Sequence, residues 1–138
     1  MQAGFARLTH VALHVRDVAA SAAFYQSYCG LVPTHARDQD KVQPVIWLSE
    51  PGKEEDFAIV LIGGGTRPAQ GDGDFSHLGF ACDSRAEVDR VAARAADEDR
   101  LVWPARQEPP PVGYYCGIAD PDGNLVEFSF GQPLGERR

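Results

Sequence analysis

The sequence predicts an α+β fold in which one small unit, ordered strand, helix, strand, strand, strand, occurs twice. Two His-bearing segments with strand-like alternation, around His10 and His77, lie about half a chain apart. Each is followed by a helix-like segment and then by three extended pieces. A glycine-rich polar stretch separates the halves. We therefore expect a single domain over residues 1–138, with module one at about 5–62, a linker at 63–74, module two at about 75–130 and a C-terminal tail at 131–138.

The first module opens with a strand and a capped helix. From Phe5 to Val15 apolar residues alternate imperfectly with others, which is typical of a strand with one buried face. Asp17 can cap a helix that runs to about Cys29, and Gly30 can end it. Further strands are expected near Val32–Arg37, Val42–Ser49 and Phe57–Ile62.

The second module repeats this order. A strand is expected at Phe75–Cys82, and the capping box from Ser84 to Glu87 opens a helix. The Pro121-Asp122-Gly123 turn joins the last two strands, and the tail GQPLGERR reads as frayed and solvated. The remaining strands are expected near Leu101–Arg106, Gly113–Ala119 and Asn124–Phe130.

Composition narrows the class of protein. A chain of 138 residues with 43% hydrophobic content can form one compact domain. We expect a cytoplasmic protein, because the sequence has no signal peptide and no apolar run of about 18 residues. Three widely spaced cysteines without a Cys-x-x-Cys pair favour reduced thiols over a disulfide framework or a structural zinc site. The net charge of −7 argues against nucleic acid and anionic membranes as partners.

Three residues of metal-ligand type stand on the predicted strands: His10, His77 and Glu127. Strand parity places each opposite the apolar face that must pack on a helix, so all three point to the other side of the sheet. A single strand histidine is more often a hydrogen-bonded structural residue. Two histidines in repeated contexts together with an inward carboxylate instead favour a catalytic divalent metal with open coordination positions.

Other residues could contribute to such a site. His14 lies on the same strand face as His10, so it could contact substrate or relay a proton near neutral pH, although a solvated strand-end histidine fits equally well. Four aromatic residues could line a pocket, although core packing is their commoner role: Trp47, Trp103, Tyr114 and Tyr115.

Three segments together resemble the vicinal oxygen chelate superfamily of glyoxalases, bleomycin-resistance proteins and extradiol dioxygenases: LTHVALHVRDVAASAAFYQSYCGL, FSHLGFACDS and ADPDGNLVEF. The resemblance spans about Leu8 to Phe130. It implies paired βαβββ modules that form a cupped, largely antiparallel sheet with helices on the outer face, and a homodimer. It also implies that His10, His77 and Glu127 hold one divalent ion, Fe²⁺, Zn²⁺, Mn²⁺, Ni²⁺ or Co²⁺, for a small-molecule substrate.

Two departures from the family patterns affect the expected reaction. The last strand of module one reads DFAIVLI, and its centre lacks the carboxylate of glyoxalase I. Gly117 stands where the extradiol signature has a tyrosine, and Tyr115, two residues earlier on the same face, could replace it if the strand shifts. Fosfomycin-modifying relatives share the His, His, Glu set, but this sequence has no concentrated basic pocket for a phosphonate.

We therefore predict a divalent-metal-dependent enzyme that acts on a small oxygen-rich organic substrate. The reaction is either ring-cleaving dioxygenase or lyase/isomerase chemistry, with Tyr115 and His14 as candidate catalytic residues. The alternative is a non-catalytic antibiotic- or metabolite-binding protein of the bleomycin-resistance type. Such binding proteins usually lack the metal ligands, so retention of all three favours the enzyme.

Overall fold

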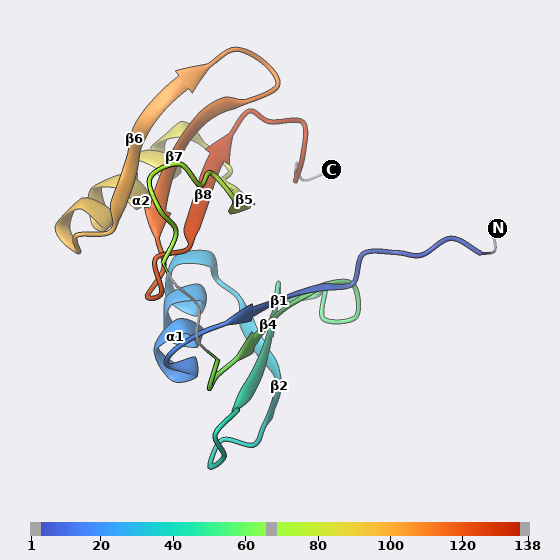
Figure 1. Cartoon of the computed structure of the whole chain (residues 1–138). Coiled ribbons are helices and arrows are strands. Elements are labelled where there is room, and N and C mark those ends of the chain that lie inside the picture. Colours follow the sequence, from blue (N-terminus) through green and yellow to red (C-terminus); the bar gives the residue numbers. More distant parts are fainter. Residues whose placement is uncertain (1–3, 66–68, 136–138) are drawn as a thin grey trace. The chain divides into compact units, whose positions relative to one another are not determined.

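The computed structural model describes residues 4–65 and 69–135 and divides into two compact units, residues 1–67 and 68–138. Each unit contains a strand, a helix and three further strands (Figure 1), which confirms the predicted α+β duplication. Unit 1 contains β1 (His10–His14), α1 (Val18–Cys29), β2 (Val32–Arg37), β3 (Val45–Ser49) and β4 (Ala58–Ile62). Unit 2 contains β5 (His77–Ala81), α2 (Arg85–Asp97), β6 (Leu101–Glu108), β7 (Gly113–Ala119) and β8 (Leu125–Phe130).

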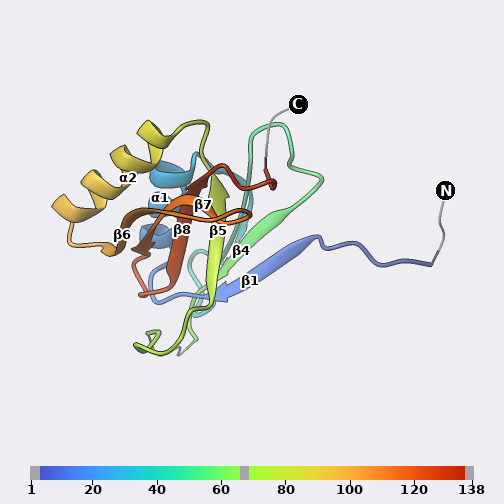
Figure 2. The ribbon, with the colours of Figure 1, turned by 90° about the horizontal axis from the view of Figure 1, so that it is seen from above.

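The two four-stranded sheets have the same topology. Their strand orders are β1-β4-β3-β2 and β5-β8-β7-β6. In each unit the first strand pairs in parallel with the last, and the other neighbours are antiparallel. Figure 2 shows β1 beside β4 and β5 beside β8. The parallel pair brings the opening strand of each module next to the strand that closes it.

Both helices begin at the predicted caps. The Asp17 carboxylate accepts a hydrogen bond from the Ala20 backbone N–H at 3.1 Å, and Gly30 ends α1 in the left-handed region at φ 69°. At α2 the Ser84 hydroxyl accepts from the Glu87 N–H at 3.2 Å. The Glu87 carboxylate in turn accepts from the Asp83 N–H at 3.0 Å, so the capping box includes the residue before the cap.

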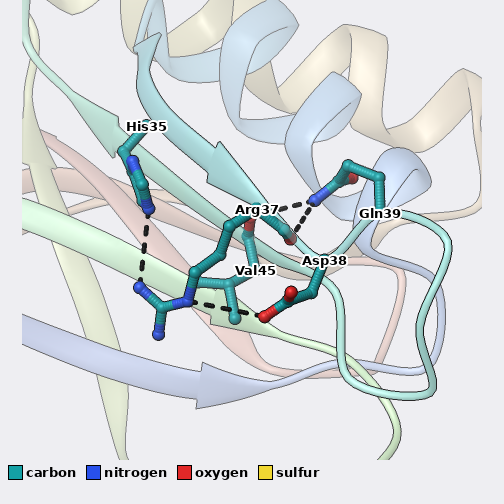
Figure 3. Close-up of polar contacts among 5 residues, drawn as sticks. All are labelled: His35, Arg37, Asp38, Gln39 and Val45. Atoms are coloured by element: carbon teal, nitrogen blue, oxygen red, sulfur yellow. Dashed lines mark hydrogen bonds and ion pairs between the residues drawn. The ribbon is translucent and has the colours of Figure 1, made fainter.

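Strand ends differ from the sequence pattern where no neighbouring strand completes the ladder. The first strand begins at His10 instead of Phe5, and Phe5 and Leu8 are 76% and 82% exposed. The third strand begins at Val45 instead of Val42, because the preceding turn is closed by a side chain. The Gln39 amide donates to the carbonyls of Arg37 and Val45 at 2.7 and 3.0 Å (Figure 3).

Each unit buries one sheet face against its own helix. In unit 2 the Cys116 thiol on β7 reaches the Val88 carbonyl on α2 at 3.8 Å, and Val126 and Phe128 of β8 are buried on the same face. No disulfide joins the three cysteines, all of which lie among the described residues. Among the described residues no helix has the length and apolar character needed to span a membrane.

Candidate functional site

Glu127 lies at the centre of the helix-free face of the unit 2 sheet. It is only 8% exposed, and its strand neighbours Val126 and Phe128 point the other way, toward the helix side. On both sides it pairs with glycine, Gly79 of β5 and Gly117 of β7. A Cβ at Gly79 would stand 3.6 Å from a carboxylate oxygen of Glu127. The two glycines form a floor beside the carboxylate that has no side chains of its own.

His77 of β5 faces this carboxylate with one nitrogen available. Its Nδ1 lies 2.8 Å from the Phe75 carbonyl oxygen, which can only accept, so Nδ1 carries the proton and donates. Nε2 lies 3.9 Å from the Glu127 Oε1. In the neutral ring this Nε2 keeps its lone pair, the form in which histidine binds metals. The predicted common face of His77 and Glu127 is observed.

The tail after β8 also reaches the carboxylate. Gln132 donates from Nε2 to the Glu127 Oε2 at 3.3 Å. Residues 131 and 133–135 of the tail are exposed, as predicted, and only Gln132 is half-buried, while 136–138 lie outside the described residues. Nothing in the sequence singles out Gln132, because a glutamine just past the last strand looks like any loop residue.

Trp103 of β6 covers the second glycine of the floor. A Cβ at Gly117 would stand 2.5 Å from the Trp103 ring atom Cε3. The indole makes T-shaped contacts with His77 and Tyr115, with ring centroids 5.7 and 6.3 Å away. Tyr115 pairs with Ser129, two residues along β8 from Glu127, so it lies on the site face as predicted but no strand shift brings it to the position of Gly117. The space above Gly117 is filled by an indole from the neighbouring strand.

Two bulges in the edge strand β6 set this arrangement. The register shifts once between Leu101 and Trp103 and again between Trp103 and Arg106, so that Trp103 pairs with Gly117 and Arg106 with Tyr115. Both side chains therefore lie on the face that carries Glu127. Pro104, which cannot donate to a ladder, was the one available signal for irregularity in this strand.

Tyr114 has the opposite orientation. Its hydroxyl donates to the Asp89 carboxylate on α2, and the Arg85 guanidinium of the same helix lies 3.8 Å from its ring centroid. The hydrogen bond to Asp89 raises the pKa of the Tyr114 hydroxyl, with burial as the next cause. Tyr114 therefore does not belong to the aromatic group of the site face.

Arg106 supplies a cation at the edge of the site face. Its guanidinium carbon lies 5.9 Å from the Tyr115 ring centroid, and its Nη2 lies 2.7 Å from the Glu108 carboxylate. The Tyr115 hydroxyl, and after it the negative charge of Glu108, raise the pKa of Arg106. The sequence pattern did not indicate Arg106, because its orientation depends on the bulge.

Unit 1 holds the other two predicted site residues, His10 and His14. His10 pairs with Ala58 as His77 pairs with Leu125, so the position equivalent to Glu127 is Val60. Val60 is thus the residue that stands where the sequence comparison with glyoxalase I expects a carboxylate. The His10 Nδ1 lies 2.9 Å from the Thr9 hydroxyl. His14 is exposed at the end of β1, and a side chain at Gly65 would collide with its imidazole.

In unit 1 the tryptophan lies on an inner strand of the sheet, whereas in unit 2 it lies on the edge strand. Trp47 pairs with Val60 and therefore occupies the place that Gly117 has in unit 2, while His35 takes the place of Trp103. The two rings make a T-shaped contact with centroids 5.1 Å apart. Figure 3 shows the neighbouring Arg37, whose guanidinium lies 3.5 Å from the His35 Nε2 and 3.7 Å from the Asp38 carboxylate.

A cavity is lined by described residues in each unit. The cavity in unit 1, of about 650 Å³, lies along the β2–β3 hairpin, with Arg37, Lys41 and Val42 in its lining, and it contains none of the predicted site residues. The cavity in unit 2, of about 310 Å³, is smaller, but Ser129 and Gln132 line it, and these adjoin Glu127 on the sheet and through a hydrogen bond. The smaller cavity is therefore the one next to the candidate chemistry.

The structure brings two of the three predicted metal ligands together within one unit. His77 and Glu127 face each other in unit 2, and His10 has the matching strand position in unit 1. Within neither unit do the described His, Cys, Asp and Glu side chains form a group of three that could hold a metal ion.

Burial raises the pKa of the Cys82 thiol to about 11, with further contributions from Glu87 and Asp83, so this thiol is protonated at neutral pH.

Comparisons with known proteins agree with this architecture. The model of the Glyoxalase/Bleomycin resistance protein/Dioxygenase superfamily matches residues 7–128. The chain is 52% identical over 128 residues to the Pseudomonas aeruginosa protein named Uncharacterized protein PA2024, covering 93% of this chain and 91% of that one.

Solved structures share the fold at lower identity. A glyoxylase/bleomycin resistance protein/dioxygenase domain from Frankia sp. EAN1pec has a TM-score of 0.70 at 22% identity, covering 94% of this chain and 100% of that one. A variant of the fosfomycin resistance protein FosX from Listeria monocytogenes, complexed with Mn(II) and 1S,2S-dihydroxypropylphosphonic acid, has a TM-score of 0.70 at 20% identity, covering 97% and 94%. The trypanothione-dependent glyoxalase I of Leishmania major has a TM-score of 0.67 at 19% identity, covering 92% and 88%. The family match over most of the chain shows that this protein belongs to the glyoxalase/bleomycin resistance protein/dioxygenase superfamily.

Proposed function

We propose that this protein is a divalent-metal-dependent enzyme that acts on a small oxygen-rich organic molecule. The observation that carries the proposal is the pairing of His77 with Glu127 on the glycine floor of unit 2. A carboxylate that is only 8% exposed is costly unless it is hydrogen-bonded or bound to a cation. Gln132 supplies one hydrogen bond, and a metal ion between Glu127 and His77 would supply the remaining stabilisation.

The donor set suits such an ion. The His77 Nε2 and the Glu127 Oε1 face each other at 3.9 Å, and an imidazole nitrogen and a carboxylate oxygen are donors that would hold a divalent ion. The Phe75 carbonyl fixes the His77 tautomer, as backbone carbonyls do for histidine ligands at known metal sites. His10 is the proposed third ligand, because it has the strand position of His77. The Mn(II) in the FosX structure supports a divalent ion in this fold.

The bound ion would provide Lewis-acid stabilisation of negative charge on substrate oxygens. The residues around it have separate roles. Trp103 covers one side of the floor and limits access of water to Glu127. We assign Tyr115 as a hydrogen-bond and proton donor beside the substrate, and His14 as a proton relay.

The family patterns divide the possible reactions. Val60 stands where a further carboxylate would complete a four-ligand set, which argues against glyoxalase I chemistry. Two histidines and one carboxylate are the donors of non-haem iron oxygenases, which favours a ring-cleaving dioxygenase, with lyase or isomerase chemistry as the other choice. We also propose a homodimer, which light scattering would detect as a mass near twice the 15.0 kDa of one chain.

Metal content tests the proposal directly. Protein purified without chelator and reconstituted with Mn²⁺, Fe²⁺, Zn²⁺, Ni²⁺ or Co²⁺ should hold about one ion per chain, measured by mass spectrometry of the metal. His77→Ala and Glu127→Gln should each lose it, and His10→Ala should weaken it. His35→Ala is the matched control, because His35 is an exposed strand histidine outside the proposed ligand set. Failure of the wild type to bind any of the five metals would refute the proposal.

The second candidate function is capture of an antibiotic or metabolite without turnover. The absence of a second carboxylate at Val60 and of a tyrosine at Gly117 favours it, since both residues belong to known catalytic patterns. Chelator separates the two functions: ligand binding that persists with EDTA, without product under aerobic or anaerobic conditions, supports capture. Consumption of the ligand that stops with EDTA supports the enzyme.

A further inference from the structure

Side chains on the site face of unit 2 lie in rows across the strands. One row contains Gly79, Glu127, Gly117 and Trp103, and the next contains Ala81, Ser129, Tyr115 and Arg106. The second row begins at the cavity of about 310 Å³, which Ala81 and Ser129 line. It ends at the Arg106 guanidinium, on the edge strand. Arg106 therefore places a cation on the same face as Glu127.

The orientation of Arg106 depends on the second β-bulge of β6. Three steps along β6, from Trp103 to Arg106, correspond to two steps along β7, from Gly117 to Tyr115. Without this bulge Ala105 would pair with Tyr115, and Arg106 would point to the helix side with Tyr114. Bulges commonly re-aim side chains next to active sites. A charge that only protected the sheet edge from aggregation would serve on either face.

The surroundings of Arg106 suit an anionic ligand. Its side chain is 66% exposed, and its guanidinium lies beside the Tyr115 ring, which restrains it. Glu108 contacts Nη2 at 2.7 Å. A guanidinium has five donors in a planar fork, so it can bind a ligand carboxylate while contacting Glu108.

We propose that the substrate of this site carries a carboxylate that Arg106 binds, with its planar body against Trp103 and Tyr115. The inference rests on the proposed function, since the oxygen-rich end of the molecule is placed at His77 and Glu127. Strand spacing of about 4.8 Å and a rise of about 3.4 Å per residue place the Cα atoms of Glu127 and Arg106 about 12 Å apart. A substituted single ring fits that span once both side chains are included.

Two probes that differ by one negative charge and one methyl group test the proposal: 3,4-dihydroxybenzoate and its methyl ester. Binding is measured in Mn²⁺-loaded protein and in metal-free protein, by quenching of Trp103 fluorescence in a Trp47→Phe background. Wild-type protein should bind the acid about tenfold more tightly than the ester, the effect of one charge-assisted hydrogen bond. Arg106→Gln should reduce this preference to within about twofold. Arg106→Lys keeps the charge but lacks the fork, so it should retain only part of it.

Arg94→Gln is the control, because Arg94 lies on α2 and pairs with Glu98 on the helix surface. It should leave the preference for the acid unchanged. An equal preference in wild type and Arg106→Gln, or no binding of either probe by the wild type, would overturn the role of Arg106. Metal analysis of the same samples separates the two proposals: if the Mn²⁺-treated protein holds no Mn²⁺ but Arg106→Gln still loses the acid preference, the carboxylate site stands and Mn²⁺ is excluded as the metal.

Discussion

Substitution of Gly117 by alanine tests whether the Trp103 indole is fixed over the floor of the site. The new Cβ would stand 2.5 Å from Cε3 and 2.8 Å from Cδ2 of the indole. The backbone at Gly117 does not lie in the left-handed region, so alanine can adopt its conformation and the cost is steric. Because the colliding atoms belong to a rigid fused ring, either the whole indole or strand β7 must move.

The magnitude follows from the overlap. Insertion of a methyl group into a packed contact costs about 1–3 kcal/mol. With a urea dependence of about 2 kcal/mol per molar, the unfolding midpoint should fall by about 0.5–1.5 M. Gly79→Ala is the matched control, because Gly79 pairs with Glu127 from the other side and its Cβ would meet only a carboxylate oxygen at 3.6 Å. That variant should remain within about 0.5 kcal/mol of the wild type.

The assay is urea unfolding of metal-free protein in a Trp47→Phe background, so that Trp103 alone reports on unit 2. Besides the lower midpoint, Gly117→Ala should shift the native emission of Trp103 to longer wavelength, because the displaced indole enters water. If both glycine variants have the same midpoint and the same native emission, the indole does not lie over Gly117, and the assignment of Trp103 as the cover of the site is wrong.

Two further predictions concern the neighbours of the site. Gln132→Ala should weaken Mn²⁺ binding about tenfold in calorimetry, because Glu127 loses a hydrogen bond at 3.3 Å. The urea midpoint of the metal-free variant should stay within about 0.5 M of the wild type. An unchanged Mn²⁺ affinity would show that Gln132 does not belong to the site. The Cys82 pKa, raised from 9.0 to about 11, means that the fold favours the neutral thiol. Its contribution to stability is complete below pH 9 and is lost as pH rises through about 11. The urea midpoint of the wild type should therefore fall more steeply over that range than that of Cys82→Ser, and the iodoacetamide reaction rate of Cys82 should keep rising; a rate that levels off near pH 9 would contradict this.

The elements that the sequence predicted well depend on local interactions. Asp17, Gly30 and Ser84 act on backbone groups within a few residues, so their effects can be read from spacing alone. Strand alternation likewise placed His77 and Glu127 on the faces that they occupy. The same alternation failed before His10, because an extended segment becomes a strand only where a neighbour completes its ladder.

The composition of the site depended on contacts that sequence spacing does not encode. The position of His77 beside Glu127 requires the parallel pairing of β5 with β8, two strands separated by the rest of unit 2. The orientation of Arg106 requires a bulge whose position is set by the register with β7, and Pro104 hinted only at irregularity. Gln132 had no signal at all, since its role arises only when the tail folds back.

The sequence by itself determined the duplicated module, the helix ends and the residue types available for metal binding, because these follow from periodicity and from capping within one turn. Tertiary structure decided the rest of the site. It placed valine at the position in unit 1 that glutamate has in unit 2, put the indole of Trp103 above Gly117 and turned Arg106 toward the carboxylate face. The physical reason is that strand register is set by hydrogen bonds between distant segments, and a shift of one residue sends a side chain to the opposite face of the sheet.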